Sequence, residues 1–510
     1  MNPLAQTEMS HASRKSTQPT AEGVPVRTLF EKQRAYFATD VTKTYEWRID
    51  QLDRLIRMLK DHYQRFADGS RRDFKTASQE NVFEVSGSIA TAEFAKSQLK
   101  EWMRPVEAPL PKFLAASGHK GMVYREPYGV TLIICPFNGP LLLSLRPAVA
   151  ALSAGNPCML KLSEALLATD ELLLELIPKY FEPETLTAVF GAREVVTKLL
   201  ELPFDFMFLT GSVGAGKAVM LAAAEYLTPV LLELGGQNPA IVDQTANLPD
   251  AAKKIAWGAM AWGGQWCTSP GYAVVHESVA EEFVADCKKA VVELYGTDPK
   301  SKPDYSRIIS PTAVNRLASM IDPKKVVYGG KFDAPARYLD PTILYPVSWS
   351  DKIMEDEIFG PLLPILTYSD LGELLAKIKS LPKPLAGYVF SREPAGDRPS
   401  VAIAFVRRGC CESDQRILVH RIYALRGSGN VRHRELLREI WLRFSHARQV
   451  GPDISTGRGY RSPVSTIYPR KGASTQSVVR FVLCCSYTIA LCVYYLITFT
   501  IVILVVSRED

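Results

Sequence analysis

The sequence lacks the cysteine and histidine spacings of a metal site or a disulfide-stabilised fold. Its nine cysteines contain no CxxC pair, and its seven histidines are not spaced as metal ligands. This arrangement excludes a zinc module and a small disulfide scaffold, and it favours a reducing compartment. No metal is therefore expected.

Two further absences narrow the class of protein. Residues 1–25 are polar and lack the apolar core of a secretory signal, so they are expected to form a flexible tail. The formal net charge of +6 is small for 510 residues, and most basic residues alternate with acidic ones. A nucleic-acid partner is therefore not expected.

What the sequence has is apolar material, 47% of its residues, enough for one large domain or several ordinary ones. The segment 52–66 places apolar side chains at intervals of three and four residues, which predicts an amphipathic helix within a helix-rich region over 26–105. From 128 to 391, short apolar runs alternate with helical patterns such as 171–181. The runs that read as buried parallel strands are 130–135, 158–162, 204–210 and 239–243. This alternation predicts a doubly wound α/β fold.

Two polar clusters follow predicted strands, at the edge where ligands of open α/β sheets bind. Gly211 to Gly216 joins a strand to a helix and offers backbone N–H groups to a phosphate, although such glycines also serve as turn residues alone. Lys161 and Glu164 follow another strand and suit the hydroxyls of a ribose. A solvated lysine and a helix cap are the alternative for that pair.

Two further clusters carry reactive side chains. Glu233 lies between an apolar run and two glycines, and Cys267 follows a tryptophan in GGQWCTSP. A thiolate attacks a carbonyl carbon, and the resulting thioester needs a base that delivers water. Glu233 has that role if burial raises its pKa toward neutrality. A cysteine beside a tryptophan is also common in apolar cores, so these residues alone leave both interpretations open.

Six motifs, in order, resemble the aldehyde dehydrogenase superfamily. They are CPFNGP (135–140), AGNPCMLKLSE (154–164), FLTGSVGAGK (208–217), LELGGQNP (232–239), GGQWCTSP (263–270) and EIFGPLLPI (357–365). The stretches EPYGV, LTPVLLELGG, YLDPTIL and KPLAGYVFS resemble its class 3 and fatty-aldehyde branch. The resemblance covers 26–391. It implies helices and a Rossmann-type cofactor-binding domain over 26–234, followed by an α/β catalytic domain over 235–391.

The resemblance implies a role for each reactive residue. Cys267 corresponds to the nucleophile, Asn138 to the amide that stabilises the oxyanion together with the Cys267 N–H, and Glu233 to the base that activates water. The cofactor-binding residues it implies are Lys161 and Glu164 for the adenosine ribose, Gly211, Ser212 and Gly216 for the pyrophosphate, and Glu357 and Phe359 for the nicotinamide ribose. A carboxylate at Glu164 repels a 2′-phosphate, so NAD is expected and NADP stays open as the alternative.

The expected function is NAD-dependent oxidation of an aldehyde to its carboxylic acid through a thiohemiacetal and a thioester. Trp262, Trp266 and Phe137 near the nucleophile indicate an apolar and narrow aldehyde tunnel, or else simple crowding. An acylating dehydrogenase that uses CoA or phosphate is the alternative, and Glu233 counts against it because hydrolysis needs that base. Leu162 and Gln237 stand where the family commonly has proline and lysine, changes expected to alter packing rather than chemistry.

The composition changes abruptly after Ser391. Residues 1–395 contain 17 arginines and 26 lysines, whereas 396–480 contain 15 arginines and one lysine, and the glycine-rich loop expected of the family does not occur. Read one base out of frame, Ala424–Val450 permits a segment close to that loop. We therefore hypothesise that the chain from between Arg392 and Val406 onward is translated out of frame, so that 392–480 is aberrant. The alternative function is then a catalytically impaired, membrane-tethered remnant.

The segment 481–507 has no charged side chain and exceeds the length of about 20 residues that crosses a bilayer. Arg480 and Lys471 before it would keep the preceding domains on the cytoplasmic side. Fatty-aldehyde relatives carry such an anchor, but an out-of-frame tail would be apolar by accident, so both interpretations stay open. With an intact C-terminal region, the resemblance implies a homodimer.

Overall fold

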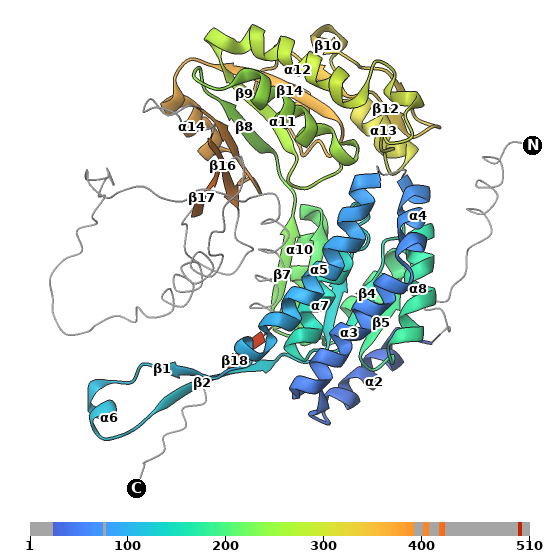
Figure 1. Cartoon of the computed structure of the whole chain (residues 1–510), viewed down its shortest axis with the longest axis vertical. Helices are drawn as coiled ribbons and strands as arrows, with labels where there is room; N and C mark the ends of the chain where they lie inside the picture. Colours follow the sequence, from blue (N-terminus) through green and yellow to red (C-terminus); the bar gives the residue numbers. More distant parts are fainter. Residues whose placement is uncertain (1–23, 75–77, 392–400, 407–417, 424–497, 502–510) are drawn as a thin grey trace, which may run out of the picture.

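Two parallel sheets covered by helices make up most of the chain (Figure 1). The computed structural model describes residues 24–74, 78–391, 401–406, 418–423 and 498–501. Its architecture confirms the α/β fold predicted from the alternation of strands and helices.

Four helices open the described chain: α2 (Val26–Phe37), α3 (Tyr45–Asp61), α4 (Tyr63–Phe74) and α5 (Ser78–Trp102). The prediction of one continuous amphipathic helix over 52–66 is wrong in one respect, because α3 ends and α4 begins within this range. His62 takes a non-helical conformation between them, with φ −118° and ψ 21°. Its ring lies edge-on to Tyr180, with the centroids 5.8 Å apart, a tertiary contact that the local pattern does not reveal.

The first sheet is all-parallel, in the order β5-β4-β3-β6-β7. Its strands are β3 (Thr131–Ile134), β4 (Cys158–Lys161), β5 (Leu186–Val189), β6 (Phe206–Gly211) and β7 (Val230–Leu234). Consecutive residues of one strand, such as Met207 and Phe208, belong to different hydrophobic clusters on the two faces of the sheet. Both faces are therefore buried, which explains why the predicted strands are apolar throughout.

The helices connecting these strands are α7 (Leu142–Ala154), α8 (Ala168–Tyr180), α9 (Arg193–Leu200) and α10 (Val213–Glu225). Before them, a long hairpin extends away from the body of the protein (Figure 1). It consists of β1 (Val106–Ala108), α6 (Lys112–Ala116) and β2 (Gly121–Pro127), and β2 also pairs with β18 (Thr498–Ile501).

The second sheet has the order β10-β13-β14-β9-β8-β15 and is parallel except for β10. Its strands are β8 (Asn238–Val242), β9 (Pro270–His276), β10 (Val326–Tyr328), β13 (Thr342–Leu344), β14 (Leu362–Tyr368) and β15 (Tyr388–Phe390). Its helices are α11 (Leu248–Met260), α12 (Ala280–Tyr295), α13 (Pro311–Ala318) and α14 (Leu371–Ser380). Two small ribbons pair β11 (Phe332–Asp333) with β12 (Tyr338–Leu339), and β16 (Val401–Val406) with β17 (Leu418–Tyr423).

Several predictions fall largely outside the described residues. The predicted tail over 1–25 lies outside them except for its last two residues, and the aberrant segment over 392–480 except for β16 and β17. The predicted membrane span over 481–507 lies outside them except for β18. Among the described helices, none has the length and apolar character needed to span a bilayer.

Candidate active site

Glu233 lies at the carboxyl end of β7, beside the end of β6. Strand pairing places Thr210 opposite Glu233 and Gly211 opposite Leu234. The predicted phosphate turn therefore begins next to the strand that carries the predicted base. Burial raises the pKa of Glu233 to about 7, so its carboxyl group exchanges protons near neutral pH.

A turn with left-handed backbone leads to Cys267. After α11, the short helix η2 (Ala261–Gly264) contains Trp262, Gly263 and Gly264 with φ values of 53°, 64° and 69°. This conformation costs a residue such as tryptophan about 1–3 kcal/mol. At Gly264 a Cβ would also collide with the backbone of Gly360, so the turn and the close approach both require glycine there.

Gln265 fastens this turn to a neighbouring segment. Its side chain is buried, and Nε2 donates to the carbonyl oxygens of Trp262 and Arg307, each at 3.0 Å. Its Oε1 accepts the N–H of Ile309 at 2.9 Å. The sequence motif contained Gln265 without a role, because two of its three partners, Arg307 and Ile309, lie more than forty residues away.

Two carboxylates act on the Cys267 thiol. Burial is the main cause that raises the pKa of Cys267 to about 12, and the charges of Glu233 and Glu357 raise it further. The backbone N–H groups of Cys267 and Thr268 act in the opposite direction. The structure thus brings together Cys267, Glu233 and Glu357, three of the predicted residues that lie far apart in the sequence.

Asn138 is buried just after β3, at 4% exposure. The ring of its neighbour Phe137 lies edge-on to Phe359, with the centroids 5.8 Å apart. This contact brings the segment of Asn138 against the loop of Glu357. Phe359 itself has a left-handed backbone, with φ 50°.

The predicted adenosine-ribose pair is formed at the end of β4. Lys161 Nζ donates to Glu164 Oε2 at 2.9 Å, and the lysine side chain is only 3% exposed whereas that of Glu164 is 60% exposed. Burial favours the neutral form of Glu164, but the charge and the hydrogen bond of Lys161 outweigh it and lower the carboxyl pKa. Glu164 is therefore an ionised acceptor at neutral pH. The departure at Leu162 adds a bond that proline lacks, since its N–H donates to the Val189 carbonyl at 2.9 Å.

The predicted pyrophosphate turn is the N-terminus of α10. Ser212 is its N-cap, and its Oγ accepts the Ala215 N–H at 3.2 Å. A Cβ at Gly216 would lie 2.9 Å from the Leu234 side chain, so glycine allows the helix to pack closely on β7. At Gly211 a Cβ would meet only ordinary contacts, so packing does not require glycine there. The helix dipole and the open turn suit an anion.

Glu357 lies in a cradle that only a glycine backbone can form. A Cβ at Gly235 would collide with the Glu357 carboxylate, and the Gly236 N–H donates a hydrogen bond to that carboxylate. Burial, partly offset by this bond, raises the pKa of Glu357 to about 6. Together with the Lys161 pair and the α10 N-terminus, this cradle supplies acceptors and donors of the kind that hold the riboses and the pyrophosphate of a dinucleotide.

The loop that carries Glu357 is held from two sides. Gln237 Nε2 donates to the carbonyl oxygens of Ile353, at 3.2 Å, and Asp356. Arg316 Nη2 donates to the carbonyl of Ile358 at 2.5 Å. The expectation that Gln237 only alters packing is therefore incomplete, because its amide holds the loop that carries Glu357.

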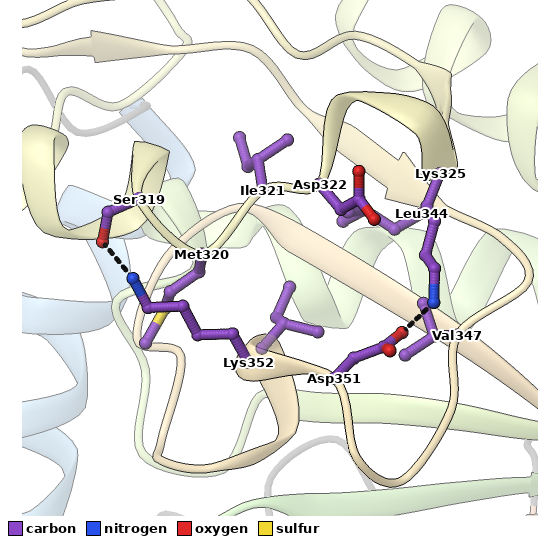
Figure 2. Close-up of a pocket in the computed structure, with 10 residues that line it drawn as sticks. Ser319, Met320, Ile321, Asp322, Lys325, Leu344, Val347, Asp351 and Lys352 are labelled. Carbon is purple, nitrogen blue, oxygen red and sulfur yellow. Dashed lines mark hydrogen bonds and ion pairs between the residues drawn. The ribbon is translucent and has the colours of Figure 1, made fainter.

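A cavity of about 200 Å³ lies next to the second sheet, between residues 319–325 and residues 351–353, which lead into this loop (Figure 2). An ion pair between Lys325 and Asp351 closes one side, and Lys352 Nζ lies 3.4 Å from Ser319 Oγ on the other. None of the predicted site residues lines this cavity, and its link to the site is Ile353, whose carbonyl accepts the Gln237 bond. This cavity is therefore separate from the site predicted around Cys267.

Comparison with known proteins agrees with the resemblance. The sequence profile of the aldehyde dehydrogenase family matches residues 8–397. The 4,4′-diaponeurosporen-aldehyde dehydrogenase of Staphylococcus aureus is 36% identical over 367 residues, 71% of this chain and 80% of that protein. The "aldehyde dehydrogenase, dimeric NADP-preferring" of Canis lupus familiaris is 36% identical over 367 residues, 72% of this chain and 81% of that protein.

A solved structure shares the fold. The substrate-bound state of Staphylococcus aureus AldH superimposes with a TM-score of 0.71 at 30% sequence identity. The superposition covers 82% of this chain and 100% of that one.

Proposed function

This chain belongs to the aldehyde dehydrogenase family, and we propose on that premise that it oxidises an apolar aldehyde with Cys267 as the nucleophile and NAD as the cofactor. The family oxidises aldehydes to carboxylic acids with NAD or NADP. The finer assignments of residues, substrate and cofactor are supported by the geometry around Cys267.

In the first half-reaction the Cys267 thiol loses its proton to solvent, and the sulfur attacks the carbonyl carbon of the aldehyde. A C–S bond forms, and the electron pair of the C=O bond moves to the oxygen, where the Asn138 amide and the Cys267 N–H donate hydrogen bonds. One such donor lowers the barrier by about 3 kcal/mol. A hydride then leaves the carbon for the nicotinamide ring when the cofactor is bound, and the carbonyl re-forms as a thioester.

In the second half-reaction Glu233 removes a proton from water as the water oxygen attacks the thioester. The C–S bond breaks, the carboxylic acid leaves, and the sulfur takes the proton held by Glu233, which restores the thiol and the carboxylate. The observation that carries the proposal is the convergence of Glu233, a desolvated carboxyl with a pKa of about 7, on the Cys267 thiol. Such a base favours hydrolysis over transfer to CoA or phosphate.

The apolar substrate is inferred from a row of indole rings beside the nucleophile. The ring of Trp266 lies 4.4 Å from that of Trp262 and 6.2 Å from that of Trp257, measured between centroids. Trp257 is 47% exposed and Trp262 is 6% exposed, so the row leads from the surface into the interior. Such a surface binds an extended hydrocarbon better than a small polar aldehyde.

NAD is proposed over NADP because the ionised Glu164 carboxylate would lie at the adenosine ribose and repel a 2′-phosphate. A homodimer is proposed from α10, whose outer face exposes the apolar side chains of Val213, Met220 and Leu221, the last at 78%. A second copy of the chain that covered this face would remove it from water.

The out-of-frame translation also stays a proposal. The family profile ends at residue 397, beside the position where lysine gives way to arginine. The activity test therefore uses two proteins, the chain as printed and a version with its frame corrected.

The test measures aldehyde-dependent NADH formation with short, aromatic and long-chain aldehydes and with 4,4′-diaponeurosporenal. We expect free acid as the product and complete loss of activity in Cys267→Ala. Formation of acyl-CoA or acyl phosphate instead of acid, or turnover by Cys267→Ala, would contradict the proposal. Activity in the frame-corrected version alone would identify the printed chain as an impaired remnant.

A further inference from the structure

The carbonyl groups of the nucleophile turn are held by side chains from two distant strands. Asn238 Nδ2 donates to the carbonyl of Cys267 at 2.9 Å and to that of Ser269 at 2.8 Å. The hydroxyl of Tyr388 donates to the carbonyl of Thr268 at 2.5 Å. Three consecutive carbonyls are thus engaged by donors from β8 and β15.

These bonds also determine where the N–H groups point. A peptide unit is planar, and its C=O and N–H point in opposite directions, so fixing a carbonyl fixes the N–H of the next residue. The Trp266 carbonyl accepts the Ser269 N–H at 2.9 Å, which fixes the N–H of Cys267. The bond from Asn238 to the Cys267 carbonyl fixes the N–H of Thr268. The N–H groups of Cys267 and Thr268 are the two that interact with the sulfur of Cys267.

Asn238 is itself rigidly oriented. It is 1% exposed, and its Oδ1 accepts the Ala386 N–H at 2.7 Å while Nδ2 makes both bonds to the turn. The oxygen of the amide therefore meets a donor, the Ala386 N–H, and its nitrogen meets two acceptors, the carbonyls of Cys267 and Ser269. Among side chains of this size, only asparagine supplies that combination.

We propose that Asn238 is a positioning residue that aims the Thr268 N–H at the sulfur of Cys267 and so stabilises the thiolate. The inference rests on the proposed role of Cys267 as the nucleophile. Asn238 touches neither sulfur nor substrate and acts through the peptide unit between Cys267 and Thr268. Tyr388 holds the following peptide unit, whose N–H belongs to Ser269, so its bond reaches the sulfur only through one further link, the Ser269 N–H to the Trp266 carbonyl.

The experiment measures the rate at which iodoacetamide alkylates Cys267 in the full chain, from pH 6 to pH 11, by peptide-resolved mass spectrometry. Because the thiolate is the reactive form and burial raises the pKa of Cys267 to about 12, the rate at each pH in this range is proportional to the small thiolate fraction. In Asn238→Ala the rate is expected to fall about tenfold at every pH in the range, the effect of a thiol pKa about one unit higher. Asn238→Ser keeps one donor and is expected to show a smaller decrease in the rate.

Two controls separate positioning from loss of structure. Asn156→Ala removes another buried asparagine, whose Oδ1 accepts the Gly129 N–H at 3.0 Å, and is expected to keep the wild-type profile. Tyr388→Phe removes a bond to the same turn and is expected to lower the alkylation rate by less than Asn238→Ala does. The proposal is overturned if both Asn238 variants keep the wild-type rate profile. It is also overturned if Tyr388→Phe and Asn156→Ala change that profile as much as Asn238→Ala does. A frame-corrected Cys267→Ala enzyme that still turns over would instead refute the proposed function.

Discussion

Replacing Glu233 with glutamine should stop the catalytic cycle at the thioester. Glutamine matches the shape of the side chain but cannot take a proton from water, so acylation continues and hydrolysis stops. Removal of a positioned general base typically slows its step about 10²–10⁴-fold. Each active site of the Glu233→Gln variant should therefore release one equivalent of NADH and then almost none.

The structure also gives the pH dependence of the hydrolytic step. With a pKa of about 7, the Glu233 carboxyl is about 9% ionised at pH 6 and about 91% ionised at pH 8. The ionised form is the base, so hydrolysis should rise about tenfold between these pH values and level off above them. In Glu233→Gln this rise should vanish, because amides do not titrate in that range.

The assay follows NADH by stopped-flow absorbance, with the frame-corrected enzyme mixed with saturating NAD and aldehyde. The amplitude of the first phase counts acylated sites, and the later slope measures hydrolysis. A Glu233→Gln variant with wild-type steady-state turnover would refute the assignment. A wild-type rise centred near pH 4.5, the ordinary value for glutamate, would refute the role of burial.

Four further outcomes are expected. Burial raises the pKa of Glu233 from 4.5 to about 7, so the free energy of unfolding falls as pH rises through this interval. In urea unfolding, Glu233→Gln should therefore be more stable than the wild type at pH 8, by at most about 3 kcal/mol, and no more stable at pH 4. Glu164→Gln should lower the preference for NAD over NADP about threefold in kcat/KM, a small change because the carboxylate is 60% exposed and water screens its charge; an unchanged ratio would argue against Glu164 as the selector. Trp266→Thr should lower kcat/KM for long-chain aldehydes about tenfold while acetaldehyde changes little, and equal losses for both would indicate that the indole row only fills space. Sequencing the transcript across codons 385–455 should reveal a displaced frame, and an uninterrupted frame as printed would reject that hypothesis.

The four strands named from the sequence, at 130–135, 158–162, 204–210 and 239–243, lie within two residues of β3, β4, β6 and β8 because their chemistry is local. A strand buried on both faces has to be apolar throughout, and short apolar runs between helical patterns have few other uses. The break at His62 could not be predicted in this way. The helical spacing continues through it, and the ring contact with Tyr180 comes from a part of the chain over a hundred residues away.

The candidate site shows the same division. Cys267 and Glu233 were recognisable from side-chain chemistry and motif order, whereas Asn238, Gln265 and Tyr388 were only letters inside the motifs. Their partners are backbone carbonyls and N–H groups, which no sequence pattern marks, at separations of up to 148 residues. Burial of a polar amide is the signal that identifies Asn238 and Gln265, and burial is known only once the fold is known.

Among the residues that the structure describes, the last side chain along the chain that bonds the nucleophile turn is Tyr388 of β15, and β15 ends one residue before Ser391. A translation product that departs from its proper frame beyond this point would still display a sulfur seated on the correct backbone. Electrophilic activity probes would then label it as readily as a working enzyme. Counting such adducts in cell extracts would therefore overstate how much dehydrogenase is present, and only product formation would distinguish the two populations.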